Sequence, residues 1–144
     1  MTNTTMTTSR IIYQNKSGGV AVINPTQSVE QALKDVPEGV PYEIVSAADI
    51  PSDRYFRNAW IADGAAVAVD LGKAKDIGHY IRRQQRSEAF APFDEIITKQ
   101  IPGLDAAEAE AARQGIRDRY ADVQVAIDAA ADPDAIKAAL EVTP

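Results

Sequence analysis

The second half of the chain carries a helical repeat of apolar residues, and this repeat limits the fold more than any other feature. Within residues 105–131 the apolar side chains recur every three or four positions, at Ala109, Ala112, Ile116, Tyr120, Val123, Ile127 and Ala130. This period places them on one face of an α-helix and is typical of a coiled-coil seam. Asp105 and Glu108 form a capping-box pattern at its start.

A second long helix is predicted before this one. Asp70 is the expected N-cap, and apolar residues then step by three and four as far as Ile101. Pro92 lies inside the segment, so we expect it to kink the helix or to divide it in two. The short Pro-Gly-Leu connection that follows predicts an antiparallel αα-hairpin.

The hairpin is expected to bury one apolar seam. We expect its first helix to bring Phe90, Phe93 and Ile97 against Ile116, Tyr120 and Val123. Asp132-Pro133 predicts a further short helix, with Asp132 as N-cap, that buries Ile136 and Leu140. Because two helices alone have little core, the hairpin must lean on the N-terminal half or on other copies of itself.

The N-terminal half reads as short strands with one short helix. The β-branched runs 10–13 and 20–23 flank Gly18-Gly19 and predict a β-hairpin. Ser28 and Gln31 form a capping box for a helix, and residues 42–45 predict a third strand. Asp63-Gly64 predicts a second hairpin between residues 59–62 and 66–69.

The predicted fold class is therefore α+β: a β-β-α-β head followed by an antiparallel helical hairpin and a short terminal helix. We expect a flexible Thr-rich arm over residues 1–9, a small head over residues 10–69 and a helical region over residues 70–144.

Composition excludes several classes of function. The 144 residues carry a net charge of −6, which argues against binding a nucleic-acid backbone. The chain has no cysteine, so disulfides, thiolate nucleophiles and cysteine-ligated metals are excluded. No apolar run approaches the ~20 residues of a membrane span, and the N-terminus lacks the features of a secretory signal. We expect a soluble protein that is made in the cytoplasm.

Catalytic and metal-binding residues are not expected. His79 is the only histidine, and its neighbours one helical turn away are Lys75 and Arg83 rather than acids. Four aspartates lie close together in the sequence, but each has an expected local role in a loop, a turn or a cap: Asp49, Asp53, Asp63 and Asp70. Neither glycine pattern of a phosphate loop is present. We therefore predict no enzyme, no cofactor and no small-molecule substrate.

Two segments are candidates for contact with a partner. Tyr55, Phe56, Arg57 and Trp60 form a dense aromatic and arginine cluster, which is typical of interface anchors. The alternative is that Phe56 and Trp60 join the head to the helices as core residues. Arg82, Arg83 and Arg86 belong to a basic stretch that either meets an acidic partner or is a solvated helix face.

The chain resembles small proteins encoded among the tail genes of tailed bacteriophages and prophages. The resemblance covers nearly all of the chain after Ser9, and its most specific part is the run Asp53-Arg54-Tyr55-Phe56-Arg57-Asn58-Ala59-Trp60. It implies a tail-fibre or tail-tip accessory protein in the virion that contacts other tail proteins, with self-association as a further option. The alternatives are a tail assembly chaperone that is absent from the virion, or a head-decoration protein. The resemblance brings no catalytic residues with it.

Overall fold

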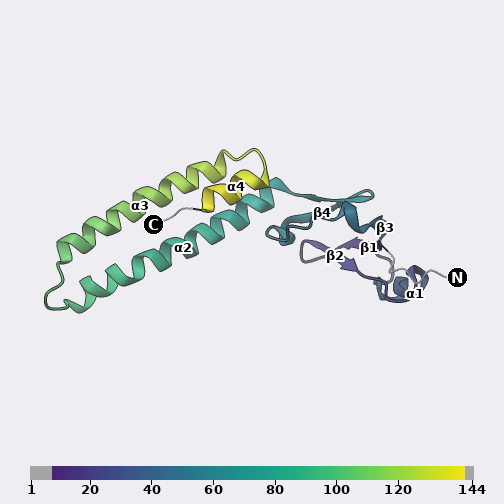
Figure 1. Cartoon of the computed structure of the whole chain (residues 1–144), viewed down its shortest axis with the longest axis horizontal. Coiled ribbons are helices and arrows are strands. Elements are labelled where there is room, and N and C mark those ends of the chain that lie inside the picture. The colour runs from purple at the N-terminus through teal and green to yellow at the C-terminus, as the bar shows by residue number, and fades with distance from the viewer. Residues whose placement is uncertain (1–7, 142–144) are drawn as a thin grey trace. The chain divides into compact units, whose positions relative to one another are not determined.

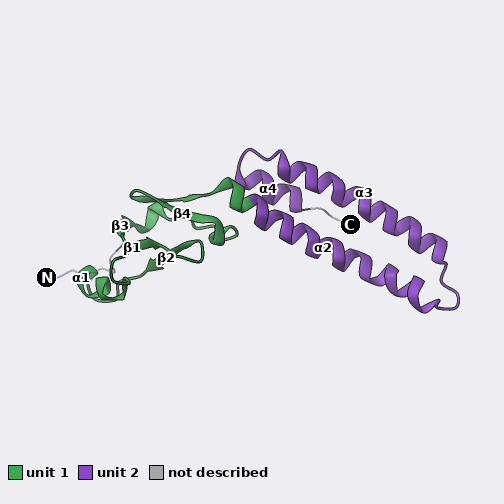
Figure 2. Ribbon diagram, turned by 180° about the vertical axis from the view of Figure 1, so that it is seen from behind, with its two compact units in different colours: residues 1–74 green, residues 75–144 purple. Residues whose placement is uncertain are grey.

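The computed structural model describes residues 8–141 and shows a mixed α and β chain (Figure 1). Short strands occupy the first half and long helices the second, so the predicted α+β class is confirmed. The chain divides into two compact units, residues 1–74 and 75–144, which are coloured separately in Figure 2. The boundary falls in the first turn of a long helix. Each unit is described below by itself.

A three-stranded antiparallel sheet forms the first part of the N-terminal unit. Its strands are β1 (Ser9–Gln14), β2 (Val20–Ile23) and β3 (Glu43–Ser46), in the order β2-β1-β3. In the predicted hairpin, Ile12 pairs with Val22 and Gln14 with Val20. The turn needs positive φ at Gly18 and Gly19, at 100° and 80°, which explains the two glycines. Ser9 is a strand residue, and the rest of the expected arm except Thr8 lies outside the described residues.

The helix after β2 is short. Its residues are α1 (Val29–Ala32), followed by a 3₁₀ turn, η1 (Leu33–Asp35). The Ser28 side chain accepts a hydrogen bond from the Gln31 backbone N–H at 3.1 Å, as the capping pattern predicts. A second 3₁₀ turn, η2 (Ala47–Asp49), follows β3.

The second predicted hairpin is also present. It consists of β4 (Trp60–Asp63) and β5 (Ala66–Val69), joined through Gly64 with a φ of 59°. A third 3₁₀ turn, η3 (Arg57–Ala59), leads into β4. The Gln14 side chain joins the hairpin to the sheet, because its Oε1 accepts from the Ala62 N–H at 3.0 Å and its Nε2 donates to the Gly19 carbonyl at 2.7 Å. The buried core between them contains Ile12, Val20, Val45, Trp60 and Val67.

Three helices make the C-terminal unit: α2 (Leu71–Lys99), α3 (Ala106–Asp128) and α4 (Pro133–Leu140). All three predicted N-caps are found, since Asp70, Asp105 and Asp132 accept hydrogen bonds from first-turn N–H groups. The helix α2 continues through Pro92, so the expected division does not occur. Pro92 has no N–H to donate to the backbone carbonyl one turn earlier in the helix. Because Pro92 is exposed, water can bond that carbonyl instead.

The register of α2 against α3 differs from the expected one. Asp94 pairs with Arg113 and His79 with Asp128, so the two helices are antiparallel. These two contacts place Phe93 and Ile97 toward the α2–α3 connection, level with Gln114 and Glu110 rather than with Tyr120 and Val123. The reason is α4, which packs against α3 and lies between α2 and α3 near the start of α2 (Figures 1 and 2).

The short helix α4 supplies the core that a two-helix hairpin lacks. Ile136 and Leu140 are buried, as predicted, together with Ile127 of α3. At Gly78 the backbone of α2 is so close that a Cβ atom there would lie 2.6 Å from Ile136 Cγ2. Within residues 8–141, no helix is long and apolar enough to cross a membrane.

Candidate functional site

The segment from Asp53 to Trp60 folds as a compact turn. The Asp53 carboxylate accepts a hydrogen bond from the Tyr55 N–H at 2.9 Å, and the Phe56 carbonyl accepts one from the Ala59 N–H at 2.8 Å. The rings of Tyr55 and Phe56 meet edge to face, with their centroids 4.8 Å apart. Aspartate at the first position is well suited to this local bonding.

Two of the four predicted contact residues in this segment belong to the core. Trp60 is 1% exposed and packs within the N-terminal unit, and Phe56 is 5% exposed. The Arg54 guanidinium covers the indole ring at 5.8 Å from its centroid. Trp60 and Phe56 are therefore structural residues rather than surface anchors, and Trp60 is a core residue of the head itself.

Of the four predicted contact residues in this segment, Tyr55 and Arg57 are exposed. The turn Gly18-Gly19 lies directly against the backbone of this segment, because a Cβ atom at Gly19 would lie 3.2 Å from the Arg57 carbonyl oxygen. Because the two glycines have no Cβ atom, the turn Gly18-Gly19 can pack against the backbone of the Asp53–Trp60 segment. Together they present Tyr55 and Arg57 from a backbone that is held in place.

The predicted basic residues lie in the C-terminal unit, on α2. Arg83 is exposed, whereas Arg82 and Arg86 are half-buried. Arg82 Nε donates to His79 Nδ1 at 3.3 Å. Partial burial and the neighbouring charges of Arg83 and Arg86 lower the pKa of Arg82. Burial is the larger cause, and the two neighbouring arginine charges add to it.

An arginine cluster around Phe90 was missed by the sequence analysis. The guanidinium of Arg86 lies 4.9 Å from the centre of the Phe90 ring, and those of Arg113 and Arg117 lie at 5.6 and 5.9 Å. Arg113 and Arg117 come from α3, so nothing in the sequence around Arg86 points to them. Only the antiparallel hairpin brings them together.

Carboxylates neutralise part of this cluster. Glu110 accepts hydrogen bonds from Arg113 at 2.7 Å and from Arg117 at 3.1 Å, and these bonds lower the pKa of Glu110. The same bond from Glu110 raises the pKa of Arg113. Asp94 adds an ion pair to Arg113 at 2.8 Å. Arg83 and Arg86 have no acidic partner among the described residues.

His79 has an acidic neighbour that its sequence surroundings do not reveal. Its Nε2 lies 2.7 Å from Asp128 Oδ1 of α3. Because Arg82 donates to Nδ1, the hydrogen-bond network assigns the ring proton to Nε2, which donates to Asp128. Both ring nitrogens are engaged within the helical unit, so neither is free to take a proton from a substrate. The pair joins α2 to α3.

The four neighbouring aspartates do not converge on a site. Asp53 and Asp70 accept local backbone hydrogen bonds, as expected for a turn and an N-cap. Asp49 lies in η2 and Asp63 at the end of β4. Among residues 8–141 there is no group of three or more histidines, aspartates and glutamates that could hold a metal ion.

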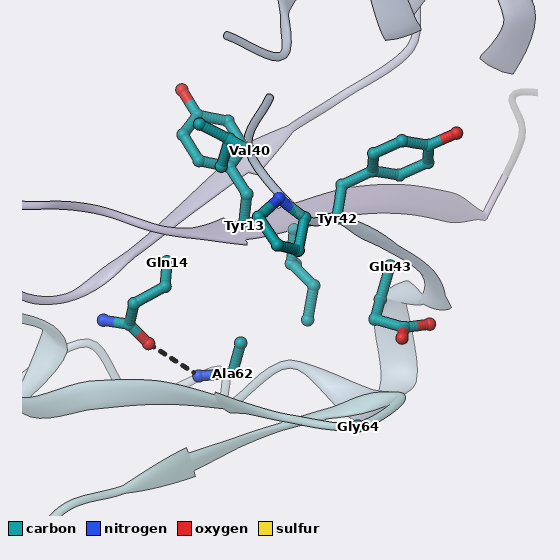
Figure 3. Close-up of a pocket in the computed structure, with 9 residues that line it drawn as sticks. Tyr13, Gln14, Val40, Tyr42, Glu43, Ala62 and Gly64 are labelled. Atoms are coloured by element: carbon teal, nitrogen blue, oxygen red, sulfur yellow. Dashed lines mark hydrogen bonds between the residues drawn. The ribbon is translucent and has the colours of Figure 1, made fainter. Parts of the chain in front are cut away.

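One cavity in the N-terminal unit was not predicted. It has a volume of about 300 Å³ and lies between the three-stranded sheet and the β4–β5 hairpin (Figure 3). Figure 3 shows the side chains of Gln14 and Glu43 extending toward Ala62 and Gly64, whereas the rings of Tyr13 and Tyr42 extend away from them. Gln14 is already bonded to Ala62, which leaves the exposed Glu43 as the free polar group of a mainly aliphatic wall. A lone carboxylate of this kind does not make an acid–base pair.

The predicted contact residues thus fall into two groups on different units. Tyr55 and Arg57 belong to the N-terminal unit, and Arg82, Arg83 and Arg86 belong to the helical unit. No protein-family model matches the chain, and comparisons with curated proteins and with solved structures also find no significant match.

Proposed function

We propose that this chain is a non-enzymatic structural protein of a tailed bacteriophage, acting as a tail-fibre or tail-tip adaptor through protein–protein contacts. The observation that carries the adaptor role is the division into two compact units, each with its own buried core. A chain built in this way offers two separately supported surfaces. The tail assignment rests on the resemblance of the Asp53–Trp60 run.

The chemistry of the described residues agrees with a role in binding rather than catalysis. The one histidine is engaged on both ring nitrogens, and the four aspartates are spread over caps and turns. On the N-terminal unit, the residues offered to a partner are Tyr55 and Arg57. Tyrosine and arginine are favoured interface residues because they combine a large contact area with directional hydrogen bonds.

The test of the tail assignment is mass spectrometry of purified particles of the phage that encodes the chain. An adaptor is expected at a fixed number of copies per particle, in the tail fraction when heads and tails are separated. Recovery in the head fraction would instead indicate a decoration protein.

The second candidate is a tail assembly chaperone that leaves before the virion is complete. The observation that favours it is the apolar stripe of α2, whose residues beyond Gly78 are only half-buried and could shield a partner temporarily. Presence in infected cells together with absence from particles would select this function and exclude the adaptor.

The contact residues are tested separately from the assignment. Replacing Arg57 by Glu is expected to lower incorporation into particles while leaving the melting temperature within about 2 °C of the wild type, since this side chain is exposed. Lys34→Glu, an exposed charge reversal elsewhere in the same unit, is the matched control and should incorporate normally. Equal incorporation of all three proteins would exclude this surface as the contact.

A further inference from the structure

The distal part of α2 carries a wider apolar stripe than α3 covers. Its members span roughly 120° of the helix at 100° per residue, and all are half-buried: Ala89, Phe90, Phe93, Ile96 and Ile97. The stripe of α3 is narrower, and it is buried at Ala109, Ile116, Tyr120, Val123 and Ile127. Each of these five α2 residues keeps part of its surface exposed, so α3 does not cover the whole stripe.

The short helix α4 covers apolar residues near the start of α2, but it does not reach the distal part. It lies near the start of α2, and its last residue, Leu140, accepts a hydrogen bond from Gln85 Nε2 at 3.3 Å. Figure 2 shows that α2 and α3 continue beyond α4 toward their connection with no third helix between them. Among residues 8–141, therefore, nothing supplies a third layer beyond Gln85.

Charged residues without an ion-pair partner lie toward both ends of this part of the hairpin. Arg82, Arg83 and Arg86 lie on α2 in a stretch without an acidic residue, whereas the opposite end carries Asp105 and Glu108 in the first turn of α3. Glu108, Arg83 and Arg86 have no ion-pair partner among the described residues. With 1.5 Å of rise per residue, both groups lie roughly 10–16 Å from the level of Phe93, in opposite directions.

We infer that the distal hairpins of two copies of this chain pack antiparallel, centred near Phe93, as a four-helix bundle. The two-fold axis places the Phe90–Ile97 stripe of one copy on the same stripe of the other. It also brings Arg82, Arg83 and Arg86 of each copy level with Asp105 and Glu108 of its partner. A second copy is the occupant that this charge pattern fits, because a surface with opposite charges at equal distances from its centre is complementary to itself. The inference does not depend on the tail assignment.

The test is the molar mass of the full chain in solution, measured by sedimentation and by light scattering on a sizing column. The expected mass is about 31 kDa, twice the 15.5 kDa of the chain. Phe93→Glu and, separately, Ile96→Lys should give monomers, since each places a charge in the stripe. Val125→Glu is the matched control: Val125 is 66% exposed on α3, outside the stripe, and this variant should remain dimeric.

A charge exchange tests the orientation without touching the apolar residues. Arg83→Glu and Glu108→Arg each place like charges opposite one another, and each is expected to weaken the dimer by at least about tenfold. The double variant restores opposite charges and should recover the wild-type dissociation constant to within about threefold. Both side chains are exposed, and circular dichroism verifies that the helices are retained.

Three results would overturn the inference. They are a monomeric wild type at 100 μM, a dimer that survives both stripe substitutions, and a double variant no tighter than its two parents. The last result would leave a dimer with a different orientation, and the antiparallel arrangement would then be wrong.

Discussion

At the scale of single residues, two positions in and after α2 depart from the residue preferences of ordinary helices. Gly78 lies within α2, where glycine costs about 1 kcal/mol relative to alanine. Gln100, just after α2, has a φ of 50°, a left-handed conformation that favours glycine. The first residue is explained by a close contact with Ile136. Nothing in the structure explains the second, so it is a position where stability can be gained.

Gly78→Ala is expected to lower the free energy of unfolding by about 1–3 kcal/mol, because the new Cβ would lie 2.6 Å from Ile136 Cγ2 in a packed core. Gly115→Ala is the matched control on α3, where a Cβ would meet nothing within 4 Å. That substitution should raise stability by about 0.5–1 kcal/mol. Urea unfolding followed by circular dichroism measures both. The same sign for the two variants would show that α4 does not approach α2 as closely as described.

Gln100→Gly is expected to stabilise the chain by about 1 kcal/mol, since glycine adopts the left-handed conformation without the steric cost that a Cβ imposes. Gln124→Gly places the same change at an exposed position inside α3, and there it should destabilise by about 1 kcal/mol. Melting temperatures of the two variants should therefore move in opposite directions. A loss of stability in Gln100→Gly would mean that this helix end is not left-handed in solution.

At the scale of helices and strands, the parts that the sequence predicts are those decided by local chemistry. Ser28, Asp70, Asp105 and Asp132 cap their helices through side chains that reach only two or three residues along the chain. Glycines with positive φ likewise determine the turns of both β-hairpins through local geometry.

The elements that could not be predicted depend on partners distant in sequence. The register of α2 on α3 was wrong because α4 competes for the α3 seam. His79 was assessed without Asp128, which lies 49 residues away. Trp60 and Phe56 were considered as surface residues because an aromatic cluster has the same composition in a core and in an interface. Burial separates the two cases, and burial is a property of the whole fold.

The ion pairs of Glu110 within α3 predict a dependence of stability on acid. Hydrogen bonds from Arg113 and Arg117 hold the pKa of Glu110 below its ordinary value of 4.5. The folded pKa is therefore lower than the unfolded one, so the contribution of Glu110 to stability is fully present above pH 4.5 and is lost as the pH falls through the lowered value.

Glu110→Gln removes this contribution, and the melting temperature of the variant should fall less steeply than that of the wild type between about pH 5 and pH 3. Glu88→Gln is the control, since Glu88 is exposed and has no ion-pair partner within the described part of the chain. If the melting temperatures of the wild type and of Glu110→Gln fall equally over this pH range, the arginine contacts contribute nothing to stability.

At the scale of the whole molecule, the two units differ in how their cores are made. The N-terminal core joins residues distant in sequence, from Ile12 to Val67, whereas the helical core joins the faces of three consecutive helices. Each core contains large side chains with almost no exposed surface, among them Trp60 in the first and Ile136 in the second. Separate cores of this kind predict separate unfolding.

Trp60→Ala is expected to remove about 3–5 kcal/mol from the N-terminal unit, because it deletes the largest fully buried side chain. In hydrogen exchange followed by mass spectrometry, the amides of β1 to β5 should then exchange at least about 100-fold faster, at roughly 1.4 kcal/mol for each factor of ten. The amides of α3 and α4 should keep their wild-type rates. Ile136→Ala is the reciprocal control and should accelerate exchange in the helical unit while the amides of β1 to β5 keep their wild-type rates. If either substitution accelerates exchange equally across residues 8–141, the two units unfold together, and the adaptor proposal loses the independence of surfaces on which it rests.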